Sequence, residues 1–499
     1  MDQENLISLH SKYNPSGEAE RYIDSISLNE KTRFCILIEP GQGYMVAPLK
    51  KKIPGAKIIA LHINKPNFKK PNFKKPDIEN HAEKIKAPDS RWYPETGVSL
   101  QDFLETEIAD SEASQIKVLE WRPALSVFGK AYLSLMEETV NFIKRSDANA
   151  RTIIAFGSRW LKNFFTNLEL IKNALSPDRQ NLFPISKPLL VTGAGPGLEE
   201  AIPMIKENFD RESVFILAAA SSQAALEAKG IKADMLISID GSQWAKFHLY
   251  DFLRNQNSYV RPCCLAASIT AALPSQCGTM PVLFLCDGSL WQTHVLKKMK
   301  IPYYTLPQRG TVAATALDLA FNLTKNDIYI AGIDFENRDI RSHARPYSFD
   351  RFIDEKAGRM KPLYSQTYKR SSLLKAGGSY SVYASWFQKQ LALYPRRLHS
   401  LGSNNPLFGT AESTVIIAET VPKTDEVARF KTIPINIHGS PSQNAFAILE
   451  AALQEPMYKA VLEKELSSLL FPGKEAVSAN ELIGAIRHLI GIDSGGNNA

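Results

Sequence analysis

Short apolar runs alternate with segments of helical spacing along most of the chain. The clearest case begins at Pro188, where the apolar run 189–191 leads into a glycine-rich turn and then a helical pattern that ends near Phe209. Strands that alternate with helices of roughly 10 to 15 residues predict a mostly parallel sheet with helices on both faces. Further apolar runs lie at 214–218, 235–239, 265–267, 282–285 and 328–331.

The same alternation occurs nearer the N-terminus. The apolar run 34–38 is followed by a glycine loop, 41–43, a helical stretch that ends in three lysines, and a second run at 57–63. We therefore expect a second Rossmann-like domain ahead of the central one. Whether its glycine loop binds a ligand or only makes a packing turn stays open.

Composition divides the chain into three expected domains. Residues 176–187 are polar and contain proline, as linkers do, which predicts an N-terminal Rossmann-like domain over 1–175 and a central domain over 186–420. Apolar residues at helical spacing predict a small, mainly helical domain over 421–499. The predicted fold class is α/β. A basic stretch rich in aromatic residues, 356–383, is assigned to the central domain.

The composition is that of a soluble globular protein. The 499 residues are 44% hydrophobic and 22% charged, and no apolar run approaches the roughly 20 residues of a membrane-spanning helix. A formal charge of +7 suits an anionic substrate and does not indicate nucleic-acid binding. The N-terminal residues lack a signal-peptide pattern, so we expect a cytoplasmic location. Five cysteines without a CxxC pair predict neither disulfides nor a zinc site.

The glycine turn after the run 189–191 is the first candidate binding site. Gly193, Gly195, Pro196 and Gly197 lie between a strand and a helix, an arrangement that presents backbone N–H groups and a helix dipole to a phosphate. The spacing matches neither GxGxxG nor a P-loop, which argues against a nicotinamide dehydrogenase and a P-loop ATPase. The alternative is a turn in which glycine only provides the backbone conformation.

Polar residues follow other predicted elements at the same edge of the sheet. Asp240 ends one strand, Gly310 and Thr311 precede a helix, and Asp334 follows the strand DIYIA. Binding sites of α/β proteins are built at the carboxyl ends of parallel strands. Each residue has a structural alternative, because a carboxylate or a threonine here also caps the following helix.

His343 is the titratable residue of most interest. It follows Asp334 after a polar loop and lies between Arg341 and Arg345. Imidazole is the usual base for removing a hydroxyl proton near neutral pH, and the two arginines would meet an anion. The alternative is an ordinary surface histidine. His248 lies in a helical pattern and is interpreted as a surface or packing residue.

Five segments occur in order across roughly residues 10–345: SKYNPSGEAE, VTGAGPGLEEAI, GIKADMLISID, RGTVAATALDLAF and IYIAGIDFENRDIRSHA. They resemble the motility-associated factor (Maf) family of flagellin glycosyltransferases, whose MptE-like central domain is shared with archaeal hydroxymethylpterin pyrophosphokinases. The central domain also resembles the fold of bacterial sialyltransferases.

The resemblance implies a donor substrate and roles for the candidate residues. The donor would be a CMP-activated nonulosonic acid of the pseudaminic or legionaminic type, and the acceptor Ser or Thr of flagellin. No metal site is predicted, and whether a divalent metal takes part stays open. The family usually has Ser after the proline of the turn, so Gly197 puts one phosphate or sugar contact in doubt. The implied phosphate cradle is Gly193, Gly195, Pro196 and Gly197, the donor pocket adds Asp240, Gly310 and Thr311, and the catalytic residues are Asp334 and the base His343.

Two other functions stay open. A pyrophosphokinase would need ATP and Mg²⁺ held by Asp240 and Asp334. A non-catalytic flagellar assembly factor would bind flagellin without modifying it, and Gly197 is the only hint of that. Domains on both sides of the central one favour a protein acceptor over a small pterin. The sequence therefore predicts a CMP-sugar-dependent protein O-glycosyltransferase, with no nucleic-acid partner.

Overall fold

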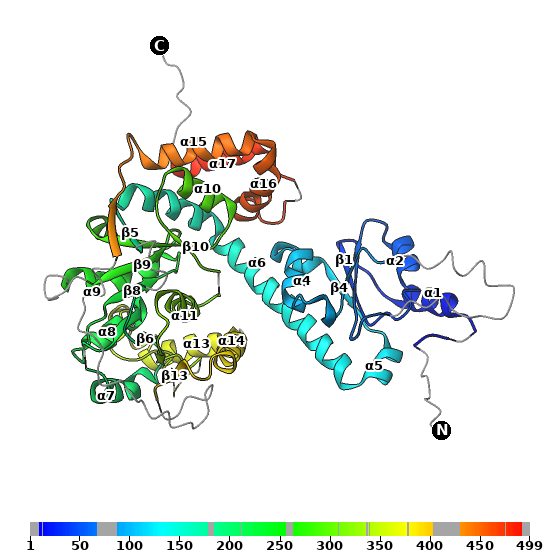
Figure 1. The fold of residues 1–499 in the computed structure, drawn as a ribbon, viewed down its shortest axis with the longest axis horizontal. Coiled ribbons are helices and arrows are strands. Elements are labelled where there is room, and N and C mark those ends of the chain that lie inside the picture. Colours follow the sequence, from blue (N-terminus) through cyan, green and yellow to red (C-terminus); the bar gives the residue numbers. More distant parts are fainter. Residues whose placement is uncertain are drawn as a thin grey trace, which may run out of the picture. The chain divides into compact units, whose positions relative to one another are not determined.

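The chain forms two compact units, Met1–Ala155 and Phe156–Ala499, drawn in Figure 1. The boundary lies 20 residues before the expected end of the N-terminal domain, because the helix α6 (Lys130–Leu170) begins in the first unit and ends in the second. The computed structural model describes residues 9–11, 13–66, 87–177, 184–210, 212–255, 263–307, 309–335, 338, 340–376, 379–402, 430–474 and 476–491.

The first unit contains a four-stranded parallel sheet with the order β3-β2-β1-β4. The central strand β1 reads FCILI and is buried at every position, so an uninterrupted apolar run is what its place in the sheet requires. This sheet confirms the second Rossmann-like fold. Its strands are β1 (Phe34–Ile38), β2 (Lys57–Leu61), β3 (Ser90–Trp92) and β4 (Ile116–Leu119), and its helices include α1 (Pro15–Ser25), α2 (Val46–Lys52), α4 (Leu100–Glu107) and α5 (Arg122–Phe128).

The glycine loop after β1 packs against the chain itself. Gly41 has a φ of +57°, and a Cβ there would lie 2.6 Å from Nε2 of His10. The His10 ring is buried between Tyr44 and Trp121, at centroid distances of 5.0 and 5.5 Å. Burial lowers the pKa of His10, so the imidazole is neutral in this packing. Of the two interpretations left open for this loop, the packing turn agrees with these contacts.

The second unit is built on a ten-stranded sheet with the order β13-β12-β6-β7-β8-β9-β10-β5-β14, in which β11 pairs with β10. Every pair is parallel except β14 with β5. The strands are β5 (Asn173–Pro177), β6 (Leu189–Thr192), β7 (Phe215–Ala219), β8 (Met235–Ser238), β9 (Cys264–Ser268), β10 (Pro281–Cys286), β11 (Tyr304–Thr305), β12 (Ile328–Ala331), β13 (Leu398–Ser400) and β14 (Phe430–Pro434).

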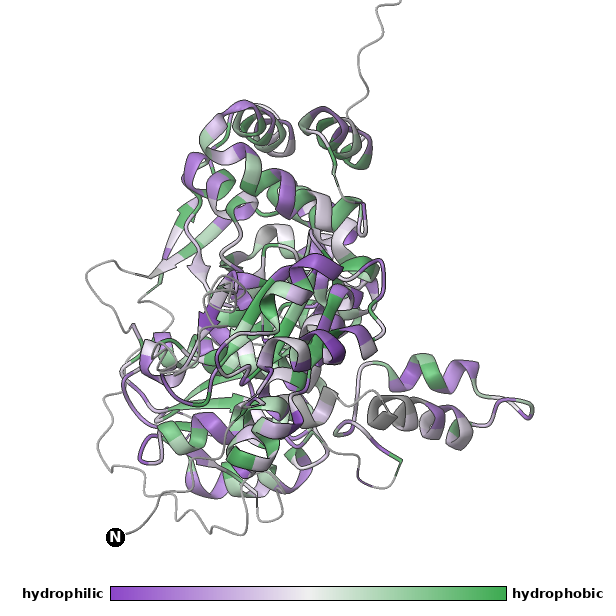
Figure 2. Ribbon diagram, turned by 90° about the vertical axis from the view of Figure 1, so that its right-hand side faces the viewer, coloured by the Kyte–Doolittle hydropathy of each residue, from purple (hydrophilic) through white to green (hydrophobic). Residues whose placement is uncertain are grey.

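Helix α11 (Val312–Leu323) packs on the middle of this sheet, and its residues Ala314, Leu317 and Ala320 belong to the same buried cluster as Val191 and Leu217. In Figure 2 most strands are coloured as hydrophobic, and hydrophilic colours appear mainly on helices and loops. The other helices are α7 (Leu198–Asn208), α8 (Gln223–Glu227), α9 (Phe247–Asn255), α10 (Leu290–Lys298), α12 (Asp350–Lys356), α13 (Leu363–Ala376) and α14 (Ser379–Leu393).

The C-terminal region is helical, as predicted. Helices α15 (Pro441–Gln454), α16 (Pro456–Leu470) and α17 (Ala479–Ile490) contact one another, and α15 and α16 also contact α10. They belong to the second compact unit, so the expected boundary near residue 421 does not separate two units. The α/β fold class, with parallel sheets and a helical C-terminal region, is confirmed.

Both edges of the large sheet are short or carry residues that disfavour further pairing. The edge strand β13 has three residues. At the other edge, β14 reads FKTIP, with Lys431 exposed and Pro434 at its end. Among the helices that the structure describes, none combines the length and the apolar character needed to cross a membrane.

Candidate functional site

The direction of the chain through the large sheet reverses beside β6. From β6 the chain proceeds through β7, β8, β9 and β10 toward one edge, whereas β12 lies on the opposite side of β6. The loops that follow β6 and β12 therefore meet at the carboxyl edge of the sheet. Such a reversal is the usual place for ligands in open α/β sheets.

The predicted glycine turn lies at this reversal, and its N–H groups have protein partners. The N–H of Gly193 donates to the carbonyl of Ala331 at 2.8 Å, and the N–H of Gly195 donates to the carbonyl of Gly332 at 2.7 Å. The N–H of Gly197 donates to the carboxylate of Asp334. The turn is thus bonded along its length to the segment that follows β12.

Close approach explains why the turn needs glycine. A Cβ on Gly195 or on Gly197 would lie 2.5 Å from a carboxylate oxygen of Asp334. Gly332 has a φ of +64°, and a Cβ there would lie 2.6 Å from the carbonyl oxygen of Gly193. The sequence resemblance implies serine at the position of Gly197. In this chain a serine Cβ would lie too close to the carboxylate of Asp334, which explains why glycine stands there.

Asp334 is 4% exposed, and its carboxylate lies at the N-terminus of α7. A negative charge is favourable there, because the first N–H groups of a helix lack partners within the helix. Among the sequence-based alternatives, the capping role fits this contact, although Asp334 caps α7 and not the helix that follows it in sequence. The catalytic role predicted for Asp334 stays a prediction.

Salt bridges hold the loop 338–345 against the first turn of α7. Glu199 accepts from the guanidinium of Arg341 at 3.0 Å and from the backbone N–H of Arg345 at 2.9 Å, and Glu200 pairs with Arg338. The N–H of Ala344 donates to the carbonyl of Ala194 at 2.8 Å. These contacts place His343 next to the glycine turn, as the two motifs predict.

The ring of His343 has two ordered neighbours. The hydroxyl of Ser342 is hydrogen-bonded to Nδ1 at 2.8 Å, and the ring stacks on Tyr347 at a centroid distance of 4.1 Å and an angle of 16°. A cavity of about 30 Å³ adjoins these side chains, room for roughly one water molecule. The bonded hydroxyl and the stacked ring orient the imidazole, as a general base requires.

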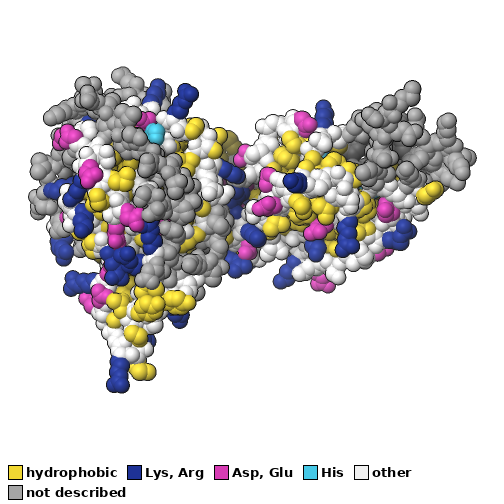
Figure 3. Space-filling model, turned by 90° about the horizontal axis from the view of Figure 1, so that it is seen from below, with side chains coloured by type: hydrophobic (Ala, Val, Ile, Leu, Met, Phe, Trp, Pro, Cys, Tyr) yellow, Lys and Arg dark blue, Asp and Glu magenta, His cyan; other side chains and the backbone are white. Residues whose placement is uncertain are grey.

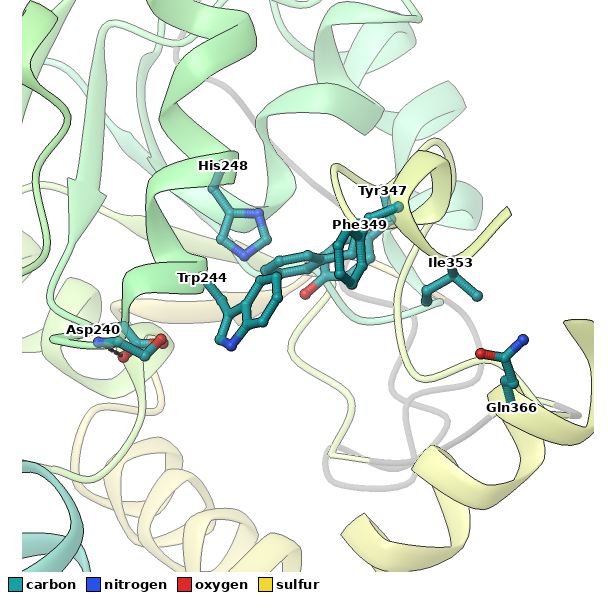
Figure 4. Close-up of a pocket in the computed structure, with 9 residues that line it drawn as sticks. Asp240, Trp244, His248, Tyr347, Phe349, Ile353 and Gln366 are labelled. Carbon is teal, nitrogen blue, oxygen red and sulfur yellow. Dashed lines mark hydrogen bonds between the residues drawn. The ribbon is translucent and has the colours of Figure 1, made fainter. Parts of the chain in front are cut away.

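A larger cavity of about 450 Å³ lies beside Tyr347. Figure 4 shows its aromatic residues clustered between Asp240 on one side and Gln366 on the other. The walls come from two stretches of sequence about 100 residues apart, one after β8 and one after β12. The lining residues are Asp240, Ser242, Trp244, His248, Tyr347, Phe349, Phe352, Ile353 and Gln366.

The aromatic rings of the cavity contact one another. The Trp244 ring lies 4.9 Å from Phe352, and the His248 ring lies 4.8 Å from Phe349 and 5.3 Å from Tyr347. Trp244 is nevertheless 50% exposed, although its ring also stacks on Phe247. Aromatic faces of this kind stack on flat ligands.

Asp240 was expected near the ligand and lines the cavity. Its carboxylate accepts from the backbone N–H of Ser242 at 2.7 Å and from the Ser242 hydroxyl at 3.0 Å, which makes a short turn at the end of β8. The turn is fixed from outside by Asn163 of α6, whose amide donates to the carbonyl oxygens of Gly241 and Thr270, each at 3.0 Å.

Gly310 and Thr311 lie elsewhere at the same edge. Gly310 has a φ of +75°, and a Cβ there would lie 2.9 Å from the ring of Tyr383. Burial raises the pKa of Tyr383. Thr311 is the N-cap residue of α11, and no side-chain capping bond is formed. Neither residue is among those that line the cavity.

The sequence predicts His248 to be a surface or packing residue. Its ring packs against Tyr347 and Phe349, and it also lines the cavity at the start of α9, which the sequence did not indicate. Trp244, Phe349 and Phe352 were not singled out at all. The signal that points to them is a cluster of aromatic residues directly after Asp240 and directly after His343 in the sequence.

Asp240 and Asp334, proposed as a Mg²⁺ pair for a kinase, follow different strands, β8 and β12. β6 and β7 separate β8 from β12, and three steps of about 4.8 Å put those strands roughly 14 Å apart. Two carboxylates that share one Mg²⁺ must both reach within about 2.1 Å of it. Among the described residues, no group of three or more His, Cys, Asp or Glu side chains is placed to hold a metal ion.

A family model described as 6-hydroxymethylpterin diphosphokinase MptE-like matches residues 158–339. A Treponema pallidum (strain Nichols) protein described as uncharacterized is 27% identical over 294 residues, which cover 59% of this chain and 61% of that protein.

Among solved structures, the chain is similar to a MAf glycosyltransferase from Magnetospirillum magneticum AMB-1, with a TM-score of 0.48 and 12% identity over 95% of this chain and 77% of that chain. The family match falls on the segment that contains the glycine turn, Asp240 and Asp334. Residues 158–339 therefore match the MptE-like family, which the motifs predicted for the central part of the chain.

Proposed function

We propose that this protein is a glycosyltransferase that moves a nonulosonic acid from a CMP-activated donor to Ser or Thr of flagellin in the cytoplasm. The observation that carries the proposal is the aromatic cavity beside Asp240, which adjoins His343 through Tyr347. Its volume of about 450 Å³ lies in the range of small-molecule sites. The MptE-like domain and the motifs that resemble the Maf family support the same function.

The chemistry of the cavity suits a nucleotide sugar. Flat apolar faces such as that of Trp244 can stack on a base or on a sugar ring. The carboxylate of Asp240 can accept hydrogen bonds from ribose hydroxyls, and it already lies at the cavity wall. Arg341 and Arg345 line the adjoining small cavity, where they pair with Glu199 and Asp350. They would also supply positive charge there for the donor phosphate and carboxylate.

The proposed reaction is a single displacement. His343 takes the proton of the acceptor hydroxyl while the oxygen attacks the anomeric carbon. The bond from that carbon to the CMP phosphate breaks, and CMP leaves as an anion. The contacts of His343 with Ser342 and Tyr347 hold the imidazole in one orientation for this step.

Intact-mass analysis tests the proposal. Purified protein, unmodified flagellin and a CMP-nonulosonic acid are incubated together, and the flagellin mass is expected to rise by whole sugar residues. The His343→Ala variant is the control and should leave the mass unchanged. A constant mass with the wild-type protein and an intact donor would remove the transferase function.

A pyrophosphokinase is the second candidate, favoured by the description of the matching family. That description does not by itself assign kinase activity to this chain. The strand order works against a Mg²⁺ shared by Asp240 and Asp334. Formation of AMP from ATP with a hydroxymethylpterin, in the presence of Mg²⁺, would support it. Flagellin that binds without any change of mass would instead support the non-catalytic assembly factor.

A further inference from the structure

The stretch after α12 is basic and carries no carboxylate. Between Lys356 and Lys369 the sequence reads KAGRMKPLYSQTYK, with four cations and no Asp or Glu. We call residues 350–369 the α12–α13 arm, since they include α12 and the first part of α13. The arm also includes Arg351, which pairs with Glu355 at 3.1 Å. Among the described residues, no carboxylate forms an ion pair with the four cations of the basic stretch, and the ammonium of Lys356 lies over the Phe352 ring. These four cations are Lys356, Arg359, Lys361 and Lys369.

The arm also displays large apolar side chains. Met360 is 92% exposed at the tip of a turn that is closed by hydrogen bonds between Gly358 and Lys361 at 3.0 and 3.1 Å. Tyr364 and Tyr368, one turn apart on α13, are 63% and 57% exposed, and their rings are parallel within 6°. Exposed apolar groups held in a fixed geometry beside unpaired charges are typical of interaction surfaces.

The arm is continuous with the candidate site. Phe352, Ile353 and Gln366 of the arm line the large cavity, and Leu363 and Thr367 line the small cavity beside His343. On α13 each exposed tyrosine directly follows a residue that lines the small cavity, Leu363 or Thr367, and is therefore turned about 100° round the helix from it. Figure 3 shows a face on which hydrophobic side chains and Lys or Arg side chains lie side by side.

We propose that the α12–α13 arm docks the acceptor polypeptide, and that the docked segment is acidic and presents apolar side chains. This inference rests on the proposed transferase function. The unpaired cations call for a partner of opposite charge, and Met360 and the two tyrosines call for apolar contacts. A polypeptide on this surface can extend one residue into the cavity, whereas a membrane or a nucleic acid would not need the surface to adjoin the cavity.

Two arm variants and one control separate this role from others. The apolar variant is Met360→Ser with Tyr364→Ser and Tyr368→Ser, and the charge variant is Arg359→Glu with Lys361→Glu and Lys369→Glu. The control is Met457→Ser with Val461→Ser and Lys464→Glu on α16, where Met457 and Val461 are 77% and 48% exposed. Because the side chains are exposed, all three variants should fold.

The probe is fluorescein-labelled unmodified flagellin monomer, with binding followed by anisotropy. Each arm variant should bind at least about tenfold more weakly than wild type, and the control should bind within twofold. Wild-type binding should weaken from 0.1 to 0.5 M salt. Hydrolysis of the CMP-sugar donor by the arm variants should stay within twofold of wild type.

Any one of three results would overturn the proposal. The first is that the wild-type protein fails to bind flagellin, and the second is that the arm variants bind flagellin as tightly as the control does. The third is that the arm variants lose binding only to anionic vesicles or to single-stranded DNA. Failure of the transferase function looks different, because wild-type protein would then bind flagellin through the arm but transfer no sugar.

Discussion

The carboxylate of Asp334 accepts a hydrogen bond from the backbone N–H of Gly197, so an acidic side chain occupies the N-terminus of α7. Among the described residues, three other helices of the second unit have the same arrangement, and in one of them Glu463 accepts from the N–H of Ala479, the first residue of α17. Glu465 accepts from the N–H of Leu290, in the first turn of α10, and Glu169 accepts from the N–H of Ser442, in the first turn of α15. A donor phosphate that approached the glycine turn would therefore meet the carboxylate of Asp334, which already occupies the N-terminus of α7.

The contact predicts a stability loss for Asp334→Asn. The amide has no charge to offer the helix N-terminus, so we expect about 1–3 kcal/mol less stability in the second unit and a melting temperature several degrees lower. Asp327→Asn is the matched control, since its half-exposed carboxylate lies just before β12 and 3.6 Å from His399. Differential scanning fluorimetry compares the two, and equal melting temperatures would contradict the assigned contact.

Gly197→Ala should destabilise through Asp334. The new Cβ would lie 2.5 Å from a carboxylate oxygen, and overpacking of this kind costs about 1–3 kcal/mol. In the Asp334→Ala background the same change should cost much less, so the two effects are non-additive. Gly484→Ala in α17, where nothing lies within 4 Å, should be neutral or slightly stabilising. Additive losses at 197 and 334 in urea titrations would mean that the two residues do not interact.

His343→Ala should lose on the order of a hundredfold in transfer rate while the affinity for CMP stays nearly the same, because general-base assistance acts on the chemical step. Ser342→Ala should show a smaller loss, since the hydroxyl only orients Nδ1. Steady-state kinetics measure the transfer rate, and calorimetry measures the affinity for CMP. Weaker CMP binding with normal turnover would make His343 a donor contact.

CMP should raise the melting temperature of the protein more than ATP does, because a transferase retains affinity for its leaving nucleotide. Trp244→Ala should remove this shift, since Trp244 lines the cavity. Tyr250→Ala is the control, because Tyr250 is similarly exposed at 41% but lies outside the cavity lining. A strong shift by ATP with Mg²⁺ and none by CMP would favour the pyrophosphokinase.

Glu169 should make the second unit sensitive to acid. Burial raises its pKa, but hydrogen bonds from Ser440 and Ser442 outweigh burial, and the net pKa lies below the usual 4.5. A carboxyl group whose pKa is lowered by folding stabilises the folded state at pH values above its unfolded pKa. This stabilisation is lost as the pH falls through the folded pKa. Glu169→Gln should therefore lower the melting temperature at pH 7 and have less effect near pH 3. An equal effect at both pH values would exclude this linkage.

The strands that the sequence predicts well are those with uninterrupted apolar runs, such as β6 and β12, because they are buried on both faces. The missed strands carry no such run. β5 reads NALSP and overlaps the segment interpreted as a linker, and β14 pairs with it from more than 250 residues away. A pairing over that distance has no local pattern.

The sequence likewise predicts some parts of the candidate site and not others. Asp240 and Asp334 were found because each directly follows a strand. The aromatic cavity was not found from the sequence, because Trp244 and Phe352 come together only after the chain has passed through four more strands. The contact between the N–H of Gly197 and the carboxylate of Asp334 could not be predicted, because neither motif shows which acceptor that N–H will have.

The short edges of the large sheet bear on how the protein behaves at high concentration. A long parallel sheet that ends in an open, flat strand would offer its backbone to another copy. Here β13 is three residues long, and β14 ends in Pro434 after an exposed Lys431. Removal of β14 would uncover β5 and its backbone groups. This five-residue strand thus protects the protein against edge-to-edge aggregation.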